Sequence, residues 1–389
     1  MAKKIIHYNI DNIDKEGANI NLIWGERSNG KSYQVKHKKG VENYLKDTYT
    51  YHDNYKDKGN IIKDVIKKGS RFILMRRWKE EITTEKIERY FADVDISKLT
   101  DGKYNCIDYY RKVLYLAVYN NETGKTSRFD KIGYVVALST EQNYAGASYL
   151  DVTDIIFEEF MSRSIYISHE ADKLMNFYST VDRKRGTTRL WLVGNTISRV
   201  CPYLNDWDLQ DIIKNQKQGE IVTKWMPTGE IDEDGIPIEV KLAIEYCKST
   251  GASSFVIGKH KDMLNRGSWQ TDPQPHLPKS RKKYKRIYKV FFQYQSFKFV
   301  GEYLKDKEDG KNICWFIYPY EKEIPNKCIV FSDVVKISKY WQRNLYDMQI
   351  NNDKLRRFMY ETFRENNIFY ANDLVGTDFK QVIDFEIKK

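Results

Sequence analysis

The stretch Asn21-Leu-Ile-Trp-Gly-Glu-Arg-Ser-Asn-Gly-Lys-Ser-Tyr33 contains a complete G-x4-G-K-S loop, from Gly25 to Ser32. The apolar run Ile20–Trp24 enters this loop, and a polar stretch without helix breakers leaves it. Strand, loop and helix in this order are the context that a phosphate-binding loop requires. The glycines allow a tight backbone turn whose N–H groups face phosphate oxygens, and the following helix adds its positive end. This stretch therefore predicts an α/β domain that binds a nucleotide.

The loop residues have distinct predicted roles. Gly25 and Gly30 let the backbone wrap around the phosphates, and Lys31 reaches the β- and γ-phosphates of ATP. The Ser32 hydroxyl is placed to ligate Mg²⁺. A chance glycine-rich turn is the alternative, and the strand before the loop argues against it.

Three further apolar runs predict the other main strands of a mostly parallel sheet: Arg71–Met75, Thr153–Phe157 and Arg189–Val193. They alternate with polar segments of helical character, as βαβ units do. Residues 113–138 follow a different sequence pattern, in which two apolar runs flank the turn-rich segment Asn-Asn-Glu-Thr-Gly-Lys. They predict a β-hairpin inserted before the third main strand.

The third main strand ends in two acids, Glu158 and Glu159. We expect Glu158 to hold Mg²⁺ and Glu159 to orient and deprotonate the attacking water. Most strands of this kind end in Asp-Glu, so Glu158 is one methylene longer than usual. This difference shifts the metal or exchanges the two roles. The alternative is a pair of solvated acids at the end of a strand.

The fourth main strand ends at Asn195, which is a candidate sensor of the γ-phosphate or of the attacking water. A basic cluster precedes it, formed by Arg183, Lys184, Arg185 and Arg189. One of these arginines is expected either to complete the site of a neighbouring subunit or to belong to a solvated or DNA-facing surface. The residues alone do not choose between these readings.

Length and composition limit the class of protein. A chain of 389 residues suggests two domains, and a net charge of +11 (65 basic minus 54 acidic residues) favours a polyanionic partner. No stretch approaches about 18 apolar residues, which argues against membrane insertion, and the opening residues lack the apolar core of a signal peptide. The five cysteines form no C-x-x-C pair, so we expect no zinc site, a reducing cytoplasmic compartment and no secretion.

The C-terminal part has its own organisation. Residues 227–238 are acidic and rich in turn formers, so they predict a surface loop, and the proline-rich residues 268–283 are the best linker candidate. Several apolar runs beyond residue 283 predict a small sheet, and Asp353–Asn366 has helical spacing. The expected domains are 1–245, a connector at 246–282, and 283–389.

A basic segment leads into this second domain. Lys279–Lys289 contains seven basic residues and no acid, which suits contacts with the phosphates of DNA or RNA. A solvated basic linker is the alternative. The candidate nucleic-acid-binding residues are Lys279, Arg281, Lys282, Lys283, Lys285 and Arg286.

The same domain is not expected to cut DNA. A two-metal nuclease needs several clustered carboxylates. Gln293 and Gln295 stand where such a strand would present aspartate, and Asp333 is nearly the only acid at the end of a C-terminal strand. One acid cannot assemble a two-metal site.

Taken together, these motifs resemble the DNA-packaging ATPase, or encapsidation protein, of Picovirinae-type small tailed phages with protein-capped linear genomes. Order and spacing agree over residues 15–205. The segments that carry the resemblance are GERSNGKSY at the loop, LMRRWKEE at 74–81, IIFEEF at 155–160, STVDRKR at 179–185 and GNTISRVCPY at 194–203. The usual aspartate of the family is replaced by Glu158.

The resemblance implies roles for individual residues. Arg27 lies inside the loop, where the family also has an arginine that contacts the nucleotide. Arg183 would be the finger that acts on the neighbouring subunit, and Asn195 would couple hydrolysis to movement. Arg76, Arg77 and Lys79 would lie near the nucleotide and the subunit boundary.

The resemblance also implies an architecture and a function. The fold would be an additional-strand P-loop ATPase (ASCE) domain, a connector and a small α+β, RNase H-like domain that is a vestigial nuclease. A pentameric ring on the portal of a prohead, in the host cytoplasm, would use ATP and Mg²⁺ to move double-stranded viral DNA. Many members dock through a phage-encoded packaging RNA. The rival hypotheses are a helicase or other remodelling ATPase, and a nucleotide-gated nucleic-acid scaffold with little turnover.

Overall fold

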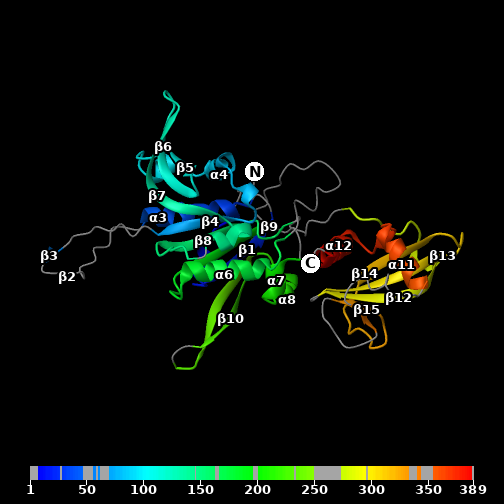
Figure 1. Cartoon of the computed structure of the whole chain (residues 1–389). Helices are drawn as coiled ribbons and strands as arrows, with labels where there is room; N and C mark the ends of the chain where they lie inside the picture. Colours follow the sequence, from blue (N-terminus) through cyan, green and yellow to red (C-terminus); the bar gives the residue numbers. More distant parts are fainter. Residues whose placement is uncertain are drawn as a thin grey trace, which may run out of the picture. The chain divides into compact units, whose positions relative to one another are not determined.

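The chain is described by a computed structural model (Figure 1). The described residues are 8–26, 29–46, 56–57, 60–61, 70–144, 146–162, 166–195, 200–231, 234–248, 273–294, 297–332, 340–342 and 354–387. They divide into two compact units, each described by itself. The first unit comprises 1–162, 169–196 and 214–268, and the second comprises 163–168, 197–213 and 269–389.

A nine-stranded sheet forms the centre of the first unit. Its strands, in spatial order, are β10 (Ile221–Ile231), β11 (Pro237–Tyr246), β1 (Ile20–Gly25), β9 (Arg189–Asn195), β8 (Val152–Glu158), β4 (Arg71–Arg76), β7 (Lys125–Ala137), β6 (Val113–Asn120) and β5 (Cys106–Tyr110). All pairs from β11 to β7 are parallel, and the pairs at both edges are antiparallel. The mixed α/β fold with a mostly parallel sheet and the four predicted main strands are therefore confirmed.

The parallel strands are buried because helices surround the sheet (Figure 1). Every residue of β1 is buried, and so are Ile155, Ile156 and Phe157 of β8, which explains their continuous apolar runs. Among its described residues, the helical elements of this unit are α1 (Asp11–Asp14), α2 (Lys31–Val35), the π-helix η1 (Lys36–Glu42), α3 (Asn43–Lys46), η2 (Lys79–Glu81), α4 (Thr84–Phe91), α5 (Ile96–Leu99), η3 (Leu138–Tyr144) and α6 (Glu170–Asp182). The strands β2 (Lys56–Asp57) and β3 (Asn60–Ile61) form a separate two-stranded sheet.

The predicted hairpin at 113–138 is confirmed: β6 and β7 pair antiparallel and precede β8 in the chain. The second half of β7 pairs in parallel with β4, from Phe72 beside Gly133 to Arg76 beside Ala137. The close approach requires glycine at 133, because a Cβ atom there would lie 2.5 Å from the Phe72 carbonyl oxygen. The distal half of the β6–β7 hairpin projects from the sheet (Figure 1).

The prediction of a surface loop at 227–238 is wrong for most of its length. Residues 227–231 belong to β10 and residues 237–238 to β11, and the two strands form a long antiparallel hairpin. Trp225, Ile231 and Ile236 are well exposed on it, so apolar side chains occur in this hairpin together with the acids. Turn-forming residues at a hairpin end and in a loop look alike in sequence, which explains the error.

A six-stranded sheet forms the second unit. Its order is β16 (Trp341–Gln342), β15 (Val330–Ser332), β12 (Tyr284–Tyr294), β13 (Phe297–Asp306), β14 (Ile313–Pro319) and β17 (Ile368–Tyr370). The neighbours β12, β13 and β14 are antiparallel, whereas β15 and β17 join them in parallel. The part of this unit that the structure describes contains the helical elements α7 (Pro202–Asp206), η4 (Arg281–Lys283), α11 (Lys354–Arg364) and α12 (Asp373–Ile387), and α8 (Gln210–Asn215) spans the boundary.

The core of this second unit is aromatic. Phe292, Trp315 and Phe379 pack in one cluster with residues of α11 and α12. The small sheet predicted beyond residue 283 is confirmed, as is the predicted helix at 353–366, where α11 lies.

Part of the proline-rich segment is fixed on the second unit. The Tyr370 backbone N–H donates to the Pro275 carbonyl at 2.8 Å, and the Gln274 N–H donates to Asp373 Oδ1 at 2.9 Å. His276 Nε2 lies 2.9 Å from the same Asp373 oxygen. Residues 274–276 thus pack as an extended segment against β17 and α12.

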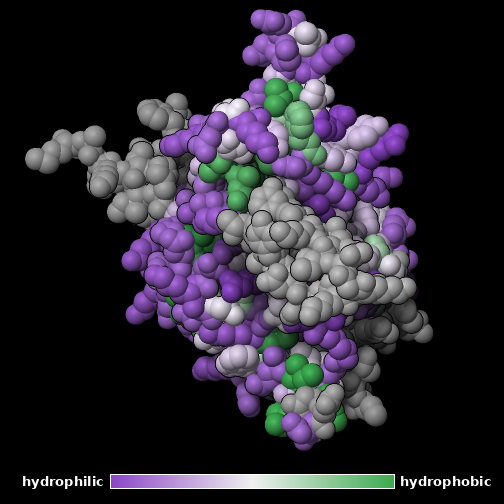
Figure 2. All heavy atoms as spheres, turned by 90° about the vertical axis from the view of Figure 1, so that its left-hand side faces the viewer, coloured by the Kyte–Doolittle hydropathy of each residue, from purple (hydrophilic) through white to green (hydrophobic). Residues whose placement is uncertain are grey.

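The described helices include none that is both long and apolar enough to span a membrane. On the face drawn in Figure 2, the described surface is mainly hydrophilic, with hydrophobic residues in small scattered groups. This surface fits the low mean hydropathy of the chain, −0.67.

Glu245 of β11 gives the first unit a testable pH dependence. Its side chain is 5% exposed and accepts a 2.7 Å hydrogen bond from the Tyr8 hydroxyl, while the Tyr8 N–H donates to the Asn29 carbonyl. Burial raises the pKa of Glu245 to about 6. The folded state therefore keeps a proton that the unfolded chain releases, so stability falls as the pH rises from about 4.5 to about 6.

Glu245→Gln is expected to remove this loss and to stabilise the protein at pH 7 by up to about 2 kcal/mol. Glutamine keeps an oxygen that accepts from Tyr8 but has no charge to bury. Urea denaturation at pH 5 and pH 7 measures the effect. Exposed Glu239→Gln on the same strand is the control. Equal pH dependence in wild type and Glu245→Gln would contradict the prediction.

Candidate nucleotide-binding site

The carboxyl ends of four neighbouring strands bring the candidate residues to one edge of the first sheet. Gly25, at the end of β1, lies beside Asn195, at the end of β9. Glu158, at the end of β8, lies beside Val193 of β9, and β4 ends next to β8 at Arg76. Ligands of open α/β sheets bind at this edge.

The loop after β1 turns sharply into α2. Gly30 precedes the helix with a φ of +91°, a left-handed conformation that favours glycine. A Cβ atom on Gly25 would lie 3.1 Å from the Cβ atom of the buried Cys247, a tight contact that favours glycine at this position. The two glycines of the motif thus serve different steric purposes. Arg27 lies outside the described residues.

Lys31 is bound within its own loop. Its Nζ atom donates to the Glu26 carbonyl at 2.6 Å, the Gly25 carbonyl at 3.3 Å and Asn29 Oδ1 at 3.1 Å. It also donates to Asn195 Oδ1 at 3.2 Å. Lys31 and Asn195, which are 164 positions apart, are therefore brought together as the predicted roles require.

Ser32 and Glu158 form the part of the site that suits a metal ion. The Ser32 hydroxyl donates to Glu158 Oε2 at 2.9 Å, and the Tyr90 hydroxyl donates to Glu158 Oε1 at 2.7 Å. Glu158 is 4% exposed, and burial raises the pKa of its carboxyl. A hydroxyl and a carboxylate are oxygen donors of the type Mg²⁺ prefers, so the residues present fit this ion.

Glu159 has a different environment from its neighbour. Its backbone is left-handed, with a φ of +59°, and its side chain is 61% exposed. Arg76 Nη2 lies 3.3 Å from its Oε2 atom, and Arg76 Nε lies 3.3 Å from Glu81 Oε2. The two adjacent acids thus differ: Glu158 is buried next to Ser32, whereas Glu159 is exposed to water.

Arg77 supports the backbone that carries the acid pair. Its Nε atom contacts both carboxylate oxygens of Glu170 at 2.9–3.0 Å, and its two Nη atoms donate to the carbonyls of Glu159 and Phe160. The Arg77 side chain is 4% exposed and that of Glu170 is fully buried. The ion pair therefore joins β4, the turn after β8 and the start of α6.

Arg77→Met is expected to reduce the free energy of unfolding by about 3–5 kcal/mol, because the Glu170 carboxylate stays buried without its guanidinium partner. Chemical denaturation measures the loss. Arg77→Met with Glu170→Met is expected to recover much of it, since an apolar pair needs no compensating charge. Arg89→Met, which removes an exposed pair with Glu85, should cost less than about 1 kcal/mol. A comparable loss in both single variants would contradict the prediction.

The basic cluster after α6 includes Arg183, which directly follows this helix. The Arg183 side chain is exposed and donates to the Ala147 carbonyl at 2.8 Å. The other members are bound within the unit: Lys184 to Glu230, Arg189 to Asp14, and Arg185 to the carbonyls of Tyr149, Leu150, Val152 and Val181.

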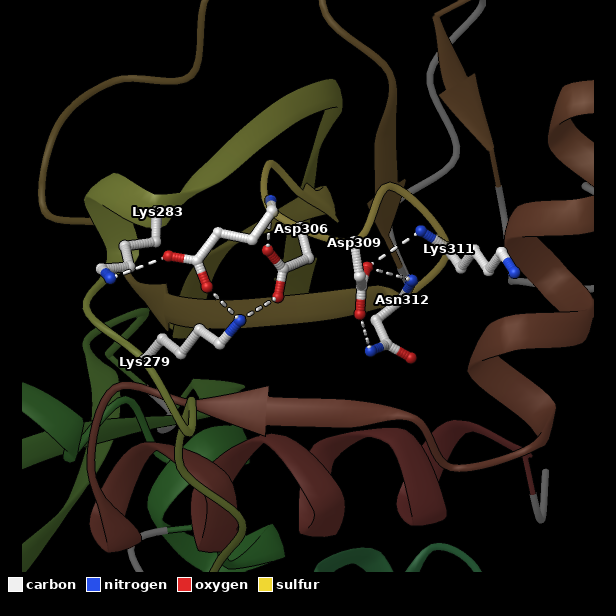
Figure 3. Close-up of polar contacts among 7 residues, drawn as sticks. Lys279, Lys283, Asp306, Asp309, Lys311 and Asn312 are labelled. Atoms are coloured by element: carbon white, nitrogen blue, oxygen red, sulfur yellow. Dashed lines mark hydrogen bonds and ion pairs between the residues drawn. The ribbon is translucent and has the colours of Figure 1, made fainter.

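The basic segment Lys279–Lys289 contains no acidic residue, but it forms ion pairs with acidic residues from elsewhere in the second unit. Lys279 Nζ lies 2.8 Å from Asp306 and 2.7 Å from Glu308, and Figure 3 shows Lys279 and Lys283 converging on the end of β13. The segment forms ion pairs between Lys279 and both Asp306 and Glu308, between Lys283 and Glu308, and between Glu302 and both Arg281 and Arg286. Among the described residues, Lys282 and Lys285 have no carboxylate partner. Gln295 and Asp333 lie outside the described residues.

Sequence reasoning missed Tyr90 and the partner of Arg77. Tyr90 is 68 positions from Glu158, and Glu170 is 93 positions from Arg77. Neither spacing matches a motif. The adjacent charges of Arg76 and Arg77 at the end of an apolar strand were the only sign that one of them is buried.

Residues 41–220 match the family model of the Podovirus DNA encapsidation protein (Gp16). The chain is 30% identical over 192 residues to the DNA packaging protein of Bacillus phage B103, covering 47% of this chain and 46% of that protein. It is 28% identical over 208 residues to the DNA packaging protein of Bacillus phage phi29, covering 51% and 49%. The matched region spans about half the length of these relatives. The resemblance to phage DNA-packaging proteins is thus confirmed.

The fold has a counterpart among solved structures. A chain of the bacteriophage phi-29 viral genome packaging motor assembly aligns with a TM-score of 0.51 and 19% identity, covering 98% of this chain and 99% of that one. At this identity the match supports the mixed α/β fold.

Proposed function

We propose that the protein is an ATP-hydrolysing motor that moves double-stranded viral DNA into a prohead. The observation that carries this proposal is the meeting of Lys31, Ser32, Glu158 and Asn195 at one sheet edge, with Glu159 next to them. These residues combine a phosphate-binding cation, two metal-binding oxygens, a base and a polar sensor. The similarity to phage DNA-packaging proteins supplies the substrate, DNA.

The sheet order supports an additional-strand (ASCE) P-loop ATPase. β9 lies between β1, which carries the phosphate loop, and β8, which carries the acid pair. This extra strand places Asn195 between the two motifs, beside Gly25. The strand order of the second unit, with β15 parallel to β12, supports an RNase H-like domain, for which we propose no cutting activity.

In this proposal each residue of the site has its own role. Lys31 exchanges the carbonyls of its own loop for the β- and γ-phosphates, and the loop N–H groups hold the remaining phosphate oxygens. Ser32 and Glu158 hold Mg²⁺, which neutralises phosphate charge when bound. Glu159 orients the attacking water and takes its proton, and Asn195 reports the state of the γ-phosphate through its contact with Lys31.

The proposed oligomeric assembly is based on the similarity of the chain to phage DNA-packaging proteins. The subunits form a ring, which we propose to be pentameric, on the portal of the prohead in the host cytoplasm, with a packaging RNA as a further partner. Arg183 acts on the ATP of the neighbouring subunit. Lys282 and Lys285, with the paired cations around them, contact nucleic-acid phosphates without reading bases.

The test is ATP hydrolysis by the purified protein alone, with duplex DNA, and with DNA and proheads. Turnover that rises with DNA and proheads, together with protection of the DNA from nuclease, is the expected result. Glu159→Gln should bind ATP and fail in both measurements, because the base is lost. Strand separation without a prohead would favour a helicase, and absence of turnover under all three conditions would leave only a nucleotide-gated scaffold.

A further inference from the structure

Helix α4 brings an aromatic side chain, that of Tyr90, to Glu158 at the end of β8. Thr83 caps its first turn, accepting a hydrogen bond from the Lys86 N–H, and Ile87 and Phe91 bury one face of the helix in the core. Tyr90 precedes the buried Phe91 and contacts its ring at 4.9 Å between centroids. The packing of α4 thereby fixes the position of the Tyr90 hydroxyl.

The Glu158 carboxylate is held by hydroxyl groups at both oxygens. Tyr90 donates to Oε1 at 2.7 Å, and Ser32 donates to Oε2 at 2.9 Å. One donor comes from α4 and the other from α2, so the carboxylate cannot rotate without losing one of them. Glutamate has one more rotatable bond than the aspartate usual at this position, and that freedom must be restricted for a defined ligand geometry.

Lys36 fixes the tyrosine in turn. Its Nζ atom lies 4.5 Å from the centroid of the Tyr90 ring, a cation–π distance, and also donates to the Tyr90 carbonyl. The same atom is 2.5 Å from Asp93, and Lys36 as a whole is 5% exposed. Because Lys36 directly follows α2, the helix of the phosphate loop holds Tyr90 at both its ring and its backbone.

We propose that Tyr90 is a positioning residue for the metal site: its hydroxyl holds the long Glu158 side chain so that the second carboxylate oxygen faces Ser32. This inference rests on the proposed nucleotide-binding function and adds to it a residue outside the recognised motifs. Tyr90 touches neither ATP nor the metal in this scheme. Its effect is confined to Glu158 and hence to the affinity for Mg²⁺.

The experiment compares wild type and Tyr90→Phe in binding a fluorescent ATP analogue, with Mg²⁺ and with EDTA. Tyr90→Phe should weaken binding with Mg²⁺ about tenfold, the size expected for a lost hydrogen bond to a charged group, and leave metal-free binding unchanged. The Mn²⁺ affinity of the nucleotide complex, followed by electron paramagnetic resonance, should fall by the same factor. Tyr104→Phe is the matched control, because it removes a tyrosine–carboxylate bond of 2.9 Å to Asp130 away from the site.

A second background separates positioning from a general structural role. In Glu158→Asp the side chain is one methylene shorter and is expected to lose its hydrogen bond with Tyr90, so adding Tyr90→Phe should change metal-dependent binding less than about twofold. Equal losses from Tyr90→Phe in both backgrounds, or loss of metal-free binding as well, would overturn the proposal while the proposed function stands. Failure of the wild-type protein to bind the nucleotide under any condition would instead overturn the proposed function, and this inference with it.

Discussion

Lys31→Ala is expected to lower kcat/KM for ATP by at least about 10²–10³-fold, the range seen when a charge-stabilising donor is removed from an active site. Lys31 is 4% exposed and its Nζ atom lies among the Gly25 and Glu26 carbonyls and Asn195. In this buried loop, a water molecule in the place of the ammonium group cannot supply the positive charge that stabilises the phosphates. Steady-state hydrolysis and equilibrium binding of ATP measure the two parts of the loss.

Lys38→Ala provides the matched control for Lys31. Lys38 lies in η1, a few residues further along the same helical segment, and pairs with Glu42 at 3.2 Å. Its removal should leave kcat/KM within about twofold of wild type, since a surface ion pair is worth little. Normal hydrolysis by Lys31→Ala would remove the phosphate loop from the mechanism and with it the central argument for an ATPase.

Arg183→Ala is expected to lower ATP turnover in the assembled ring about 10³-fold while leaving ATP binding unchanged. The exposed guanidinium donates to the Ala147 carbonyl, a contact whose loss costs little stability. The Arg183 backbone is left-handed, with a φ of +47°, and alanine bears a similar conformational cost there. Any large effect therefore reports the guanidinium itself.

Mixed rings test whether Arg183 acts on the neighbouring subunit. A Lys31→Ala subunit retains Arg183, and an Arg183→Ala subunit retains an intact phosphate loop, so mixing the two inactive variants should restore part of the turnover. Lys184→Ala, next in sequence and paired with Glu230, is the control that should remain active. Normal hydrolysis by assembled Arg183→Ala rings would refute the assignment.

Local sequence was sufficient for the four main strands and the β6–β7 hairpin of the first sheet, but not for β5, β10 and β11 or for all of the pairing. Fully buried parallel strands leave continuous apolar runs, and β1, β4, β8 and β9 were predicted for this reason. The parallel pairing of β7 with β4 depends on contacts more than 50 positions apart, such as Phe72 with Gly133, and no local pattern encodes it. The hairpin was therefore predicted correctly, whereas its parallel pairing with β4 was not predicted.

The candidate site likewise combines contacts that the motifs predict with contacts that no local pattern predicts. Ser32 and Glu158 stand at strand ends, and parallel strands bring such ends together, so their meeting follows from the motifs. Tyr90 and Glu170 lie on helices whose rotation about the axis is set by tertiary packing, and their partners are distant in sequence. Buried polar contacts of this kind become visible only in three dimensions.

The ion pairs at the end of β13 have a consequence for salt dependence. Each phosphate that a protein cation neutralises releases condensed counterions and contributes about −0.9 to the slope of log K against log salt. Lys279 and Arg281 must first give up Asp306 and Glu302, and carboxylates freed in this way take up cations from solution. Lys282 and Lys285 are free of this exchange. In the proposed contact with nucleic acid, these ion pairs would therefore make the salt slope shallower than the seven positive charges of the segment alone would give.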